Sequence, residues 1–382
     1  MSSVTTTATG TVVRGRDRYV DFIRAFSLLV VVAWHWVFTI IVWEDDGPHA
    51  SNPLGFTTGL WVLTWAFQVM PLFFYVGGYG HLRSWEKARD RGQSIWTLVG
   101  VRLKRLAVPT FALLGVWIVI GIAVSAVWDW DWTWRAVKLV VSPLWFMGVY
   151  LMLVLILPVA MWLHVRFDTI VLVTLAGIAG LVDVVRFRYD LPAFGLINMI
   201  VVWGLCHQLG FFYDRIVTSR RTVDWTLLIA GALALAALVG SGLYPGSMVG
   251  VPGETSNMAP PTVCIVALVL LQAGMLEIIR PTIQARLERP SWERVSDVIN
   301  RFALPLFLFH TTGMALYRAI NYVIFGNRTD VRQPDPLWWL TRPLAFIGPL
   351  LCTLPVIYLF GRKWVRRERP PSFTPTNAPS PS

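Results

Sequence analysis

Ten long apolar runs divide this chain of 382 residues, and they restrict its fold more than any other feature. Each run is close to the ~20 residues that an α-helix needs to cross a hydrocarbon core. Only 14% of the residues are charged, whereas a soluble domain carries about 25%. The sequence therefore predicts an all-α, polytopic membrane helix bundle of about ten transmembrane helices. The runs cover approximately residues 20–42, 59–80, 106–127, 142–163, 169–185, 194–213, 225–243, 261–279, 302–325 and 337–360.

The distribution of basic residues predicts the orientation of the bundle. With both termini in the cytoplasm, most of the 33 lysines and arginines fall in loops on the inner side, as the positive-inside rule requires. The net charge of +11 then suits the anionic lipids of an inner leaflet and calls for no nucleic-acid partner. We expect a multi-pass protein of the plasma membrane with membrane lipids as its surroundings.

The chain divides into one membrane domain and two tails. Residues 1–18 are predicted to be a disordered basic tail, residues 19–362 an integral membrane domain, and residues 363–382 a basic and then Pro/Ser-rich tail. The first run is too long for a cleavable signal peptide and reads as a signal anchor. Cys206, Cys264 and Cys352 fall in different runs without a CxxC pair, so neither disulfides nor a metal site is predicted.

Arg24 and His35 are the most informative polar residues, because both lie inside the first apolar run. Eleven residues at about 100° each end roughly 20° past three turns, so both side chains share one helix face about 16 Å apart. Ionisable residues inside a membrane are a functional-site hypothesis by default. The alternative is an arginine that snorkels to the surface and a histidine that packs against a neighbouring helix. Asp21 is placed to pair with Arg24 at i, i+3.

Two further segments carry residue patterns that suit a ligand. The string VMPLFFYVGGYG places Gly77 and Gly78 among aromatic residues, which favours close approach of a ligand or of another helix. The string VRLKRLAVP places Arg102 and Arg105 three residues apart before the third run. On a helix these two arginines share a face that suits phosphates, although such a segment also fits an ordinary positive-inside flank.

The later runs add SPLWFMGVYLM with Trp145 and PLFLFHTTGM with His310. Together with DFIRA and Arg24-x10-His35, the aromatic–Gly segment and R-x-x-R-L-x-x-P, this ordered set resembles the acyltransferase 3 family of polytopic membrane acyltransferases. The resemblance spans about residues 17 to 360. FYVGGYG departs from the F-V-L-S-G-F-type string that is more usual in the family.

The resemblance implies transfer of an acyl group, commonly acetyl, from a cytoplasmic thioester donor to a hydroxyl of an envelope saccharide or glycolipid. It also implies that Arg24 and His35 are the central functional pair. From the residues, Arg24 with Arg102 and Arg105 would hold the phosphates of an acyl-CoA donor. His35 would then act as general base on the acceptor hydroxyl, either directly or through a histidyl-acyl intermediate. No tightly bound cofactor is expected.

The predicted site needs an oxyanion stabiliser as well. Backbone N–H groups around Gly77 and Gly78, or the Trp145 indole, are the candidates. His310 is a second catalytic candidate, with a packed core histidine as the alternative. Arg318, in the outer part of the ninth run, would meet the acceptor or a neighbouring carboxylate. Four histidines near run ends are predicted to be structural: His49, His81, His164 and His207.

A transporter or flippase of an envelope precursor is the alternative function. Buried Arg and His would suit a transport pathway equally. The sequence shows no internal repeat, which weakens this alternative. A non-catalytic scaffold would leave Arg24 and His35 unexplained, and acyl transfer from acetyl-CoA would separate these possibilities.

Overall fold

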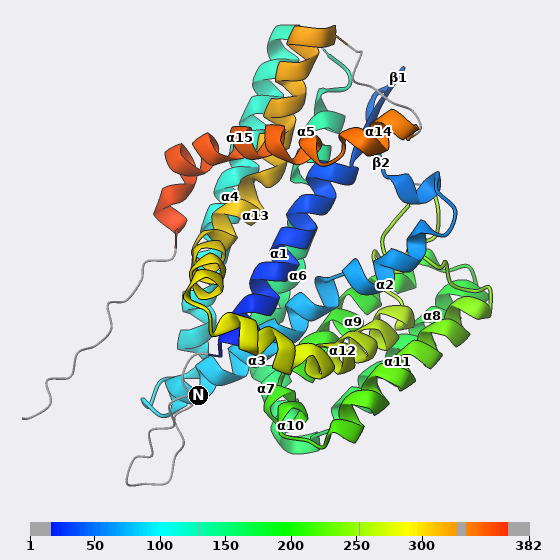
Figure 1. Ribbon diagram of the computed structural model, residues 1–382, viewed down its shortest axis with the longest axis vertical. Coiled ribbons are helices and arrows are strands. Elements are labelled where there is room, and N and C mark those ends of the chain that lie inside the picture. Colours follow the sequence, from blue (N-terminus) through cyan, green and yellow to red (C-terminus); the bar gives the residue numbers. More distant parts are fainter. Residues whose placement is uncertain (1–16, 129, 252, 327–333, 366–382) are drawn as a thin grey trace, which may run out of the picture.

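The computed structural model of the protein describes residues 17–128, 130–251, 253–326 and 334–365, and most of these residues are helical (Figure 1). The first half contains α1 (Arg18–Phe38), β1 (Ile40–Glu44), β2 (Gly47–Ser51), η1 (Pro53–Gly55), η2 (Leu60–Leu63), α2 (Thr64–Phe67), α3 (Met70–Arg89), α4 (Ile95–Trp128), α5 (Thr133–Val141), α6 (Leu144–Leu155), α7 (Leu157–Phe167) and α8 (Ile170–Arg188). The second half contains η3 (Pro192–Phe194), α9 (Gly195–Gly210), α10 (Tyr213–Val217), α11 (Arg221–Gly240), α12 (Val263–Leu287), α13 (Pro290–Phe325), α14 (Pro336–Thr341), η5 (Leu344–Phe346), α15 (Ile347–Val356), η6 (Ile357–Gly361) and η7 (Arg362–Trp364).

Among the described residues, eight helical segments are long and apolar enough to cross a membrane, which supports the predicted all-α membrane bundle. They are Arg18–Phe38, Leu60–Arg89, Ile95–Trp128, Ile170–Arg188, Pro192–Gly210, Arg221–Gly240, Val263–Leu287 and Leu344–Trp364. Helices α5 and α6 form a further pair, bent by 49°, that passes the same test together. The ninth predicted run lies in α13, a helix of 36 residues that includes polar residues at its centre. Most of the predicted tails, residues 1–16 and 366–382, lies outside the described residues.

The first predicted run, 20–42, does not stay helical to its end. Helix α1 stops at Phe38, and the chain enters an antiparallel hairpin in which Ile40 pairs with Ser51. The β-branched residues of β1 favour a strand over a helix. Gly47 completes the turn at φ +116°, a conformation that glycine adopts without strain. The apolar run was therefore a helix followed by a strand.

Two other boundaries also differ from the predicted runs. Helix α4 begins at Ile95, eleven residues before the third predicted run, so Arg102 and Arg105 belong to the same helix as that run. Its 34 residues extend about 51 Å, well beyond a hydrocarbon core of about 30 Å. The fourth predicted run, 142–163, is divided between α6 and α7, with Pro143 before α6 and Pro158 at the start of α7. Proline ends the preceding helix because it lacks an N–H and restricts the residue before it.

In the described part of the chain, glycines allow three pairs of helices to approach closely. A Cβ on Gly78 of α3 would overlap the His207 carbonyl oxygen of α9. Gly231 of α11 lies in the same way against the backbone of α12, and Gly313 of α13 lies against Thr353 of α15. Small residues are the usual means of close helix packing in membranes, where no hydrophobic effect drives helices together.

Helices α1 and α13 run side by side in the same direction (Figure 1). Three hydrogen bonds show this, because their partners advance together along both helices. The Asn300 side chain donates to the Asp21 carbonyl (2.8 Å), and the Trp36 indole donates to the His310 carbonyl (2.9 Å). The third bond joins Arg318 to Thr39 (3.1 Å). Residues 24–35 of α1 therefore face the segment of α13 that carries His310.

Candidate active site

Helix α1 presents Arg24 and His35 as the spacing predicts. The helix is continuous from Arg18 to Phe38, which keeps the two residues on one face about 16 Å apart. The expected pair with Asp21 is confirmed, because Arg24 Nη1 lies 3.2 Å from Asp21 Oδ1. The side chains of Arg24 and His35 are both partly buried. Arg24 lies near the N-terminal end of α1 and His35 lies in its last turn.

The imidazole rings of His35 and His310 lie together in the bundle. Their centroids are 5.1 Å apart, and the rings meet edge to face at 66°. The Trp36 indole bonds the His310 carbonyl and thereby fixes α1 against α13 at this level. Two residues that are 275 positions apart in the chain, and that the sequence singled out separately, thus form one centre.

The tautomer of His310 follows from its hydrogen bond. His310 Nδ1 lies 2.6 Å from the Phe307 carbonyl oxygen, which can only accept, so Nδ1 carries the proton. Nε2 is then an acceptor with a free lone pair. Within the described part of the chain this atom is buried and has no hydrogen-bond partner. A buried nitrogen of this kind is a base held in one orientation.

Arg102 joins Arg24 at Gly80 of α3. Arg102 Nη2 donates to Ser84 Oγ (2.6 Å) and approaches the Gly80 carbonyl (3.4 Å). A Cβ on Gly80 would lie 3.4 Å from Arg24 Nη2. Arg105 is exposed instead. The structure therefore brings together Arg24 and Arg102, whereas Arg105, on the same helix, is exposed.

A buried histidine pair lies beside these two arginines, and the sequence did not indicate it. His81 Nδ1 and His207 Nε2 are 2.8 Å apart, and the Tyr150 hydroxyl lies 3.3 Å from His81 Nε2. Both histidines are almost fully buried. These two histidines were predicted to be structural, and together with Tyr150 they form a continuous hydrogen-bonded row next to Gly80.

The two glycines of the VGGYG string serve packing in the structure. Gly78 lies against the His207 carbonyl, and Gly77 lies against the Tyr150 ring. Both residues are in the middle of α3, where each backbone N–H is bonded to the carbonyl four residues earlier. Their N–H groups are therefore not available to an oxyanion. Trp145 remains a candidate, near the start of α6, with its ring 6.0 Å from that of Trp203.

A buried ion pair at the N-terminal end of α1 was also not predicted. Arg280 donates two hydrogen bonds to Glu277 (2.6 and 2.8 Å) and one to the Tyr213 hydroxyl (2.8 Å). The Tyr213 hydroxyl donates in turn to Asp17 (3.0 Å), whose side chain caps α1. Buried charges are retained when they are paired and hydrogen-bonded. This network fixes the end of α1 from which Arg24 projects.

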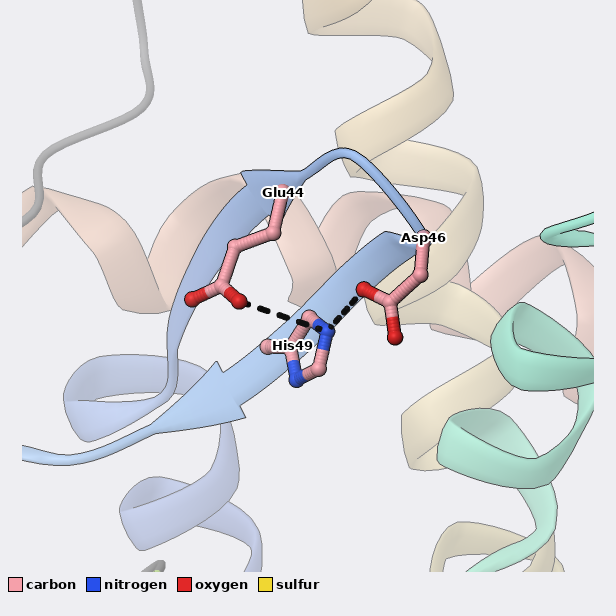
Figure 2. Close-up of side chains that lie close together, drawn as sticks. All are labelled: Glu44, Asp46 and His49. Atoms are coloured by element: carbon pink, nitrogen blue, oxygen red, sulfur yellow. Dashed lines mark hydrogen bonds and ion pairs between the residues drawn. The ribbon is translucent and has the colours of Figure 1, made fainter.

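Glu44, Asp46 and His49 gather on the hairpin after α1, as Figure 2 shows. His49 Nε2 lies 2.6 Å from Asp46 Oδ1 and 3.7 Å from Glu44 Oε2. The His49 hydrogen bond, and then the nearby Arg135, lower the pKa of Asp46. Arg135 of α5 pairs with Asp46 and lies 3.4 Å from His49 Nδ1, so its guanidinium group is a positive charge that this cluster already holds. The cluster ties the hairpin to α5.

Comparison with protein families matches residues 17–362 to the acyltransferase 3 family, described as an acyltransferase domain. The match covers nearly the whole chain and spans every residue of the candidate site. Neither the curated proteins nor the solved structures that were compared match the chain.

Proposed function

Because the chain belongs to the acyltransferase 3 family, we propose that it is a membrane O-acyltransferase with acyl-CoA as donor. The simplest acyl group is acetyl, and the acceptor is a hydroxyl of a cell-envelope saccharide or glycolipid. Membrane acyl transfer follows from the family and from the apolar helices. The donor, the acceptor and the roles below are the proposed part.

One observation carries the proposal: a buried base with a fixed tautomer next to the histidine of α1. His310 Nε2 has a free lone pair, and the His35 ring lies beside it. One of these imidazoles takes the proton of the acceptor hydroxyl as its oxygen bonds to the acyl carbon. The C–S bond then breaks, and the thiolate leaves with that proton as the free thiol. A positioned general base of this kind contributes about 10²–10⁴-fold to a rate.

The donor fits the other end of α1. Arg24 and Arg102 place two guanidinium groups at Gly80, on the side that charge distribution predicts to be cytoplasmic. Guanidinium groups suit the phosphates of a nucleotide. The separation of about 16 Å along α1 from Arg24 to His35 is the distance that the long, thin pantetheine arm would span to bring the thioester to the histidines.

Two buried polar atoms suit the amides of that arm, one between these ends of α1 and one near Arg24, where the Asn300 side chain bonds the Asp21 carbonyl. Ser27 Oγ on α1 and Asn300 Oδ1 on α13 are buried and have no hydrogen-bond partner in the described residues. An unpaired buried polar atom costs about 1–3 kcal/mol, so a ligand that supplies N–H and C=O groups there would be stabilised. Pantetheine carries two amides and supplies both kinds of group.

The test compares three histidine variants in lipid nanodiscs with acetyl-CoA. His35→Ala and His310→Ala should each lower turnover by about 10²–10⁴-fold, while coenzyme A binding and thermal stability change little. His164→Ala is the matched control, because His164 is a partly buried histidine of α7 outside the centre, and its turnover should stay near that of the wild type.

The results that would contradict the proposal are equally specific. Near-normal turnover in both His35→Ala and His310→Ala would show that neither histidine is the general base. Turnover that falls only in proportion to folded protein would make the histidines packing residues. A wild-type protein that moves a lipid-linked sugar across liposomes without any acyl transfer would identify a transporter.

A further inference from the structure

A row of aromatic rings leads from α3 through α6 to the histidine centre. The centroid of the Phe73 ring of α3 lies 5.0 Å from that of Phe146 of α6, and the Phe146 centroid lies 5.2 Å from that of Phe307 of α13. The Phe307 ring in turn lies 5.8 Å from the ring of His310. These separations are those of aromatic rings in contact. We call Phe73, Phe146 and Phe307 the aromatic wall.

The part of the aromatic wall next to His310 is buried and closely packed. Phe146 and Phe307 are 4% and 8% exposed, and the Phe146 ring also packs against Phe74 (5.2 Å) and Tyr150 (6.0 Å). The Phe307 carbonyl oxygen accepts the hydrogen bond from His310 Nδ1, which fixes this phenylalanine relative to the histidine. A group that enters such a core must displace several side chains together, and extra methylene groups there are unfavourable.

The aromatic wall lies where the acyl group of the donor would be. The thioester carbon must reach the imidazoles for the proposed transfer, so the acyl chain beyond it lies against the rings that pack on them. In the described residues, the rings of His35 and Phe307 pack against that of His310. Phe307 precedes His310 by three residues on α13, which runs parallel to α1, so it lies on the side of Arg24 and the donor. A chain that continues past the acyl carbon meets Phe307 and, behind it, Phe146.

We propose that Phe146 and Phe307 determine the length of the acyl group, because their rings occupy the space beside His310 that a chain longer than acetyl would need. This inference rests on the proposed function, since it specifies the donor of the same site. One methylene more or less in a hydrophobic pocket changes specificity by about 10- to 200-fold, so a fixed phenyl ring is sufficient to separate acetyl from butyryl. Neither ring carries an acidic or basic group, so both act on the choice of acyl group and the proton transfer stays with the histidines.

The experiment measures the binding of two coenzyme A thioethers to the full chain in phosphatidylcholine nanodiscs. S-ethyl-CoA and S-butyl-CoA match acetyl and butyryl in chain length but cannot transfer an acyl group, so the measurement needs no acceptor. The wild type should bind S-ethyl-CoA more tightly than S-butyl-CoA by about 10-fold or more, because the two additional methylenes meet the aromatic wall.

Phe146→Ala and Phe307→Ala should each improve the binding of S-butyl-CoA relative to S-ethyl-CoA by about 10-fold or more, since the burial of each additional methylene favours binding by about 4-fold. Phe146→Leu, a smaller truncation, should shift the same ratio in the same direction by less. Phe212→Ala is the matched control, because Phe212 is also 4% exposed but packs against His164 of α7 (4.7 Å), outside the histidine centre. Its ratio should equal that of the wild type.

Equal binding of the two thioethers by the wild type would overturn the aromatic wall as the limit on chain length. The same conclusion would follow if Phe146→Ala and Phe307→Ala both kept the wild-type ratio, or if Phe212→Ala changed it equally. Acetyl-CoA turnover is measured separately. A wild type that prefers S-ethyl-CoA but transfers no acetyl group would refute the proposed function, whereas normal acetyl transfer with an unchanged thioether ratio in the variants would refute this inference alone.

Discussion

Replacing Gly78 by alanine should separate α3 from α9. The new Cβ would lie 2.9 Å from the His207 carbonyl carbon, would overlap its oxygen, and would approach Gly210 Cα at 3.3 Å. Ordinary contact begins at 3.4 Å, so the carbon alone must retreat by 0.5 Å and the oxygen by more than about 1 Å. These atoms belong to helix backbones and cannot rotate away as a side chain would.

The free energy of this shift follows from known cases of overpacking. Forcing an extra methyl group into a packed core costs about 1–3 kcal/mol, and a rigid backbone contact places Gly78→Ala at the upper end. The same displacement would stretch the bond between His81 and His207, which is 2.8 Å long and joins the same two helices. We therefore expect a loss of stability of about 3 kcal/mol, together with a weaker histidine pair.

The assay is unfolding in detergent micelles, followed by tryptophan fluorescence during denaturant titration. Gly204→Ala is the matched control, because Gly204 lies in α9 and a Cβ there meets nothing within 4 Å. That variant should be neutral or more stable, since alanine is favoured over glycine in a helix by about 1 kcal/mol. Equal stability of Gly78→Ala and Gly204→Ala would refute the proposed backbone contact.

Three further predictions concern the donor site, the topology and the hairpin. Arg102→Ala should weaken coenzyme A binding by about 1–3 kcal/mol in calorimetry, whereas Arg105→Ala, at an exposed position, should bind normally; equal losses would place the phosphates elsewhere. A reporter fused after Ser382 should read cytoplasmic, and an external signal would reverse the donor side. The His49 hydrogen bond lowers the pKa of Asp46 below its usual 3.8, so the carboxylate stabilises the hairpin fully above about pH 4 and loses this effect as pH falls through the lowered pKa. His49→Ala should raise the midpoint of the Asp46 NMR titration, and an unchanged midpoint would contradict the hydrogen bond.

The sequence was sufficient where the physics is local. The spacing of Arg24 and His35 fixes their common face through the helix period alone, and the bond between Asp21 and Arg24 follows from the same period. The late His310 was singled out because an ionisable residue in an apolar run is rare. Its contact with His35 could not be read from the sequence, since it depends on α1 and α13 packing side by side.

The sequence was insufficient where a feature depends on tertiary contacts. His81 and His207 are 126 residues apart, and each looked like an ordinary residue near a helix end. Gly78 carried two readings, and only the approach of α9 decides between them. Composition also misled at the end of the first run, because the β-branched residues of β1 are as apolar as a helix would be and differ only in their backbone preference.

Helix α1 is fixed by side-chain hydrogen bonds at both of its ends. At the N-terminal end the Tyr213 hydroxyl donates to Asp17, and at the C-terminal end Arg318 and Arg342 donate to the carbonyls of Thr39 and Val37. A helix that is fixed at both ends can neither shift along its axis nor rotate to compensate for an inserted or deleted residue. One extra residue between Arg24 and His35 would turn them by about 100° relative to each other, with both ends still fixed. An insertion or deletion between Arg24 and His35 would therefore disrupt the histidine centre. The length of this segment is constrained more strongly than the identity of its side chains.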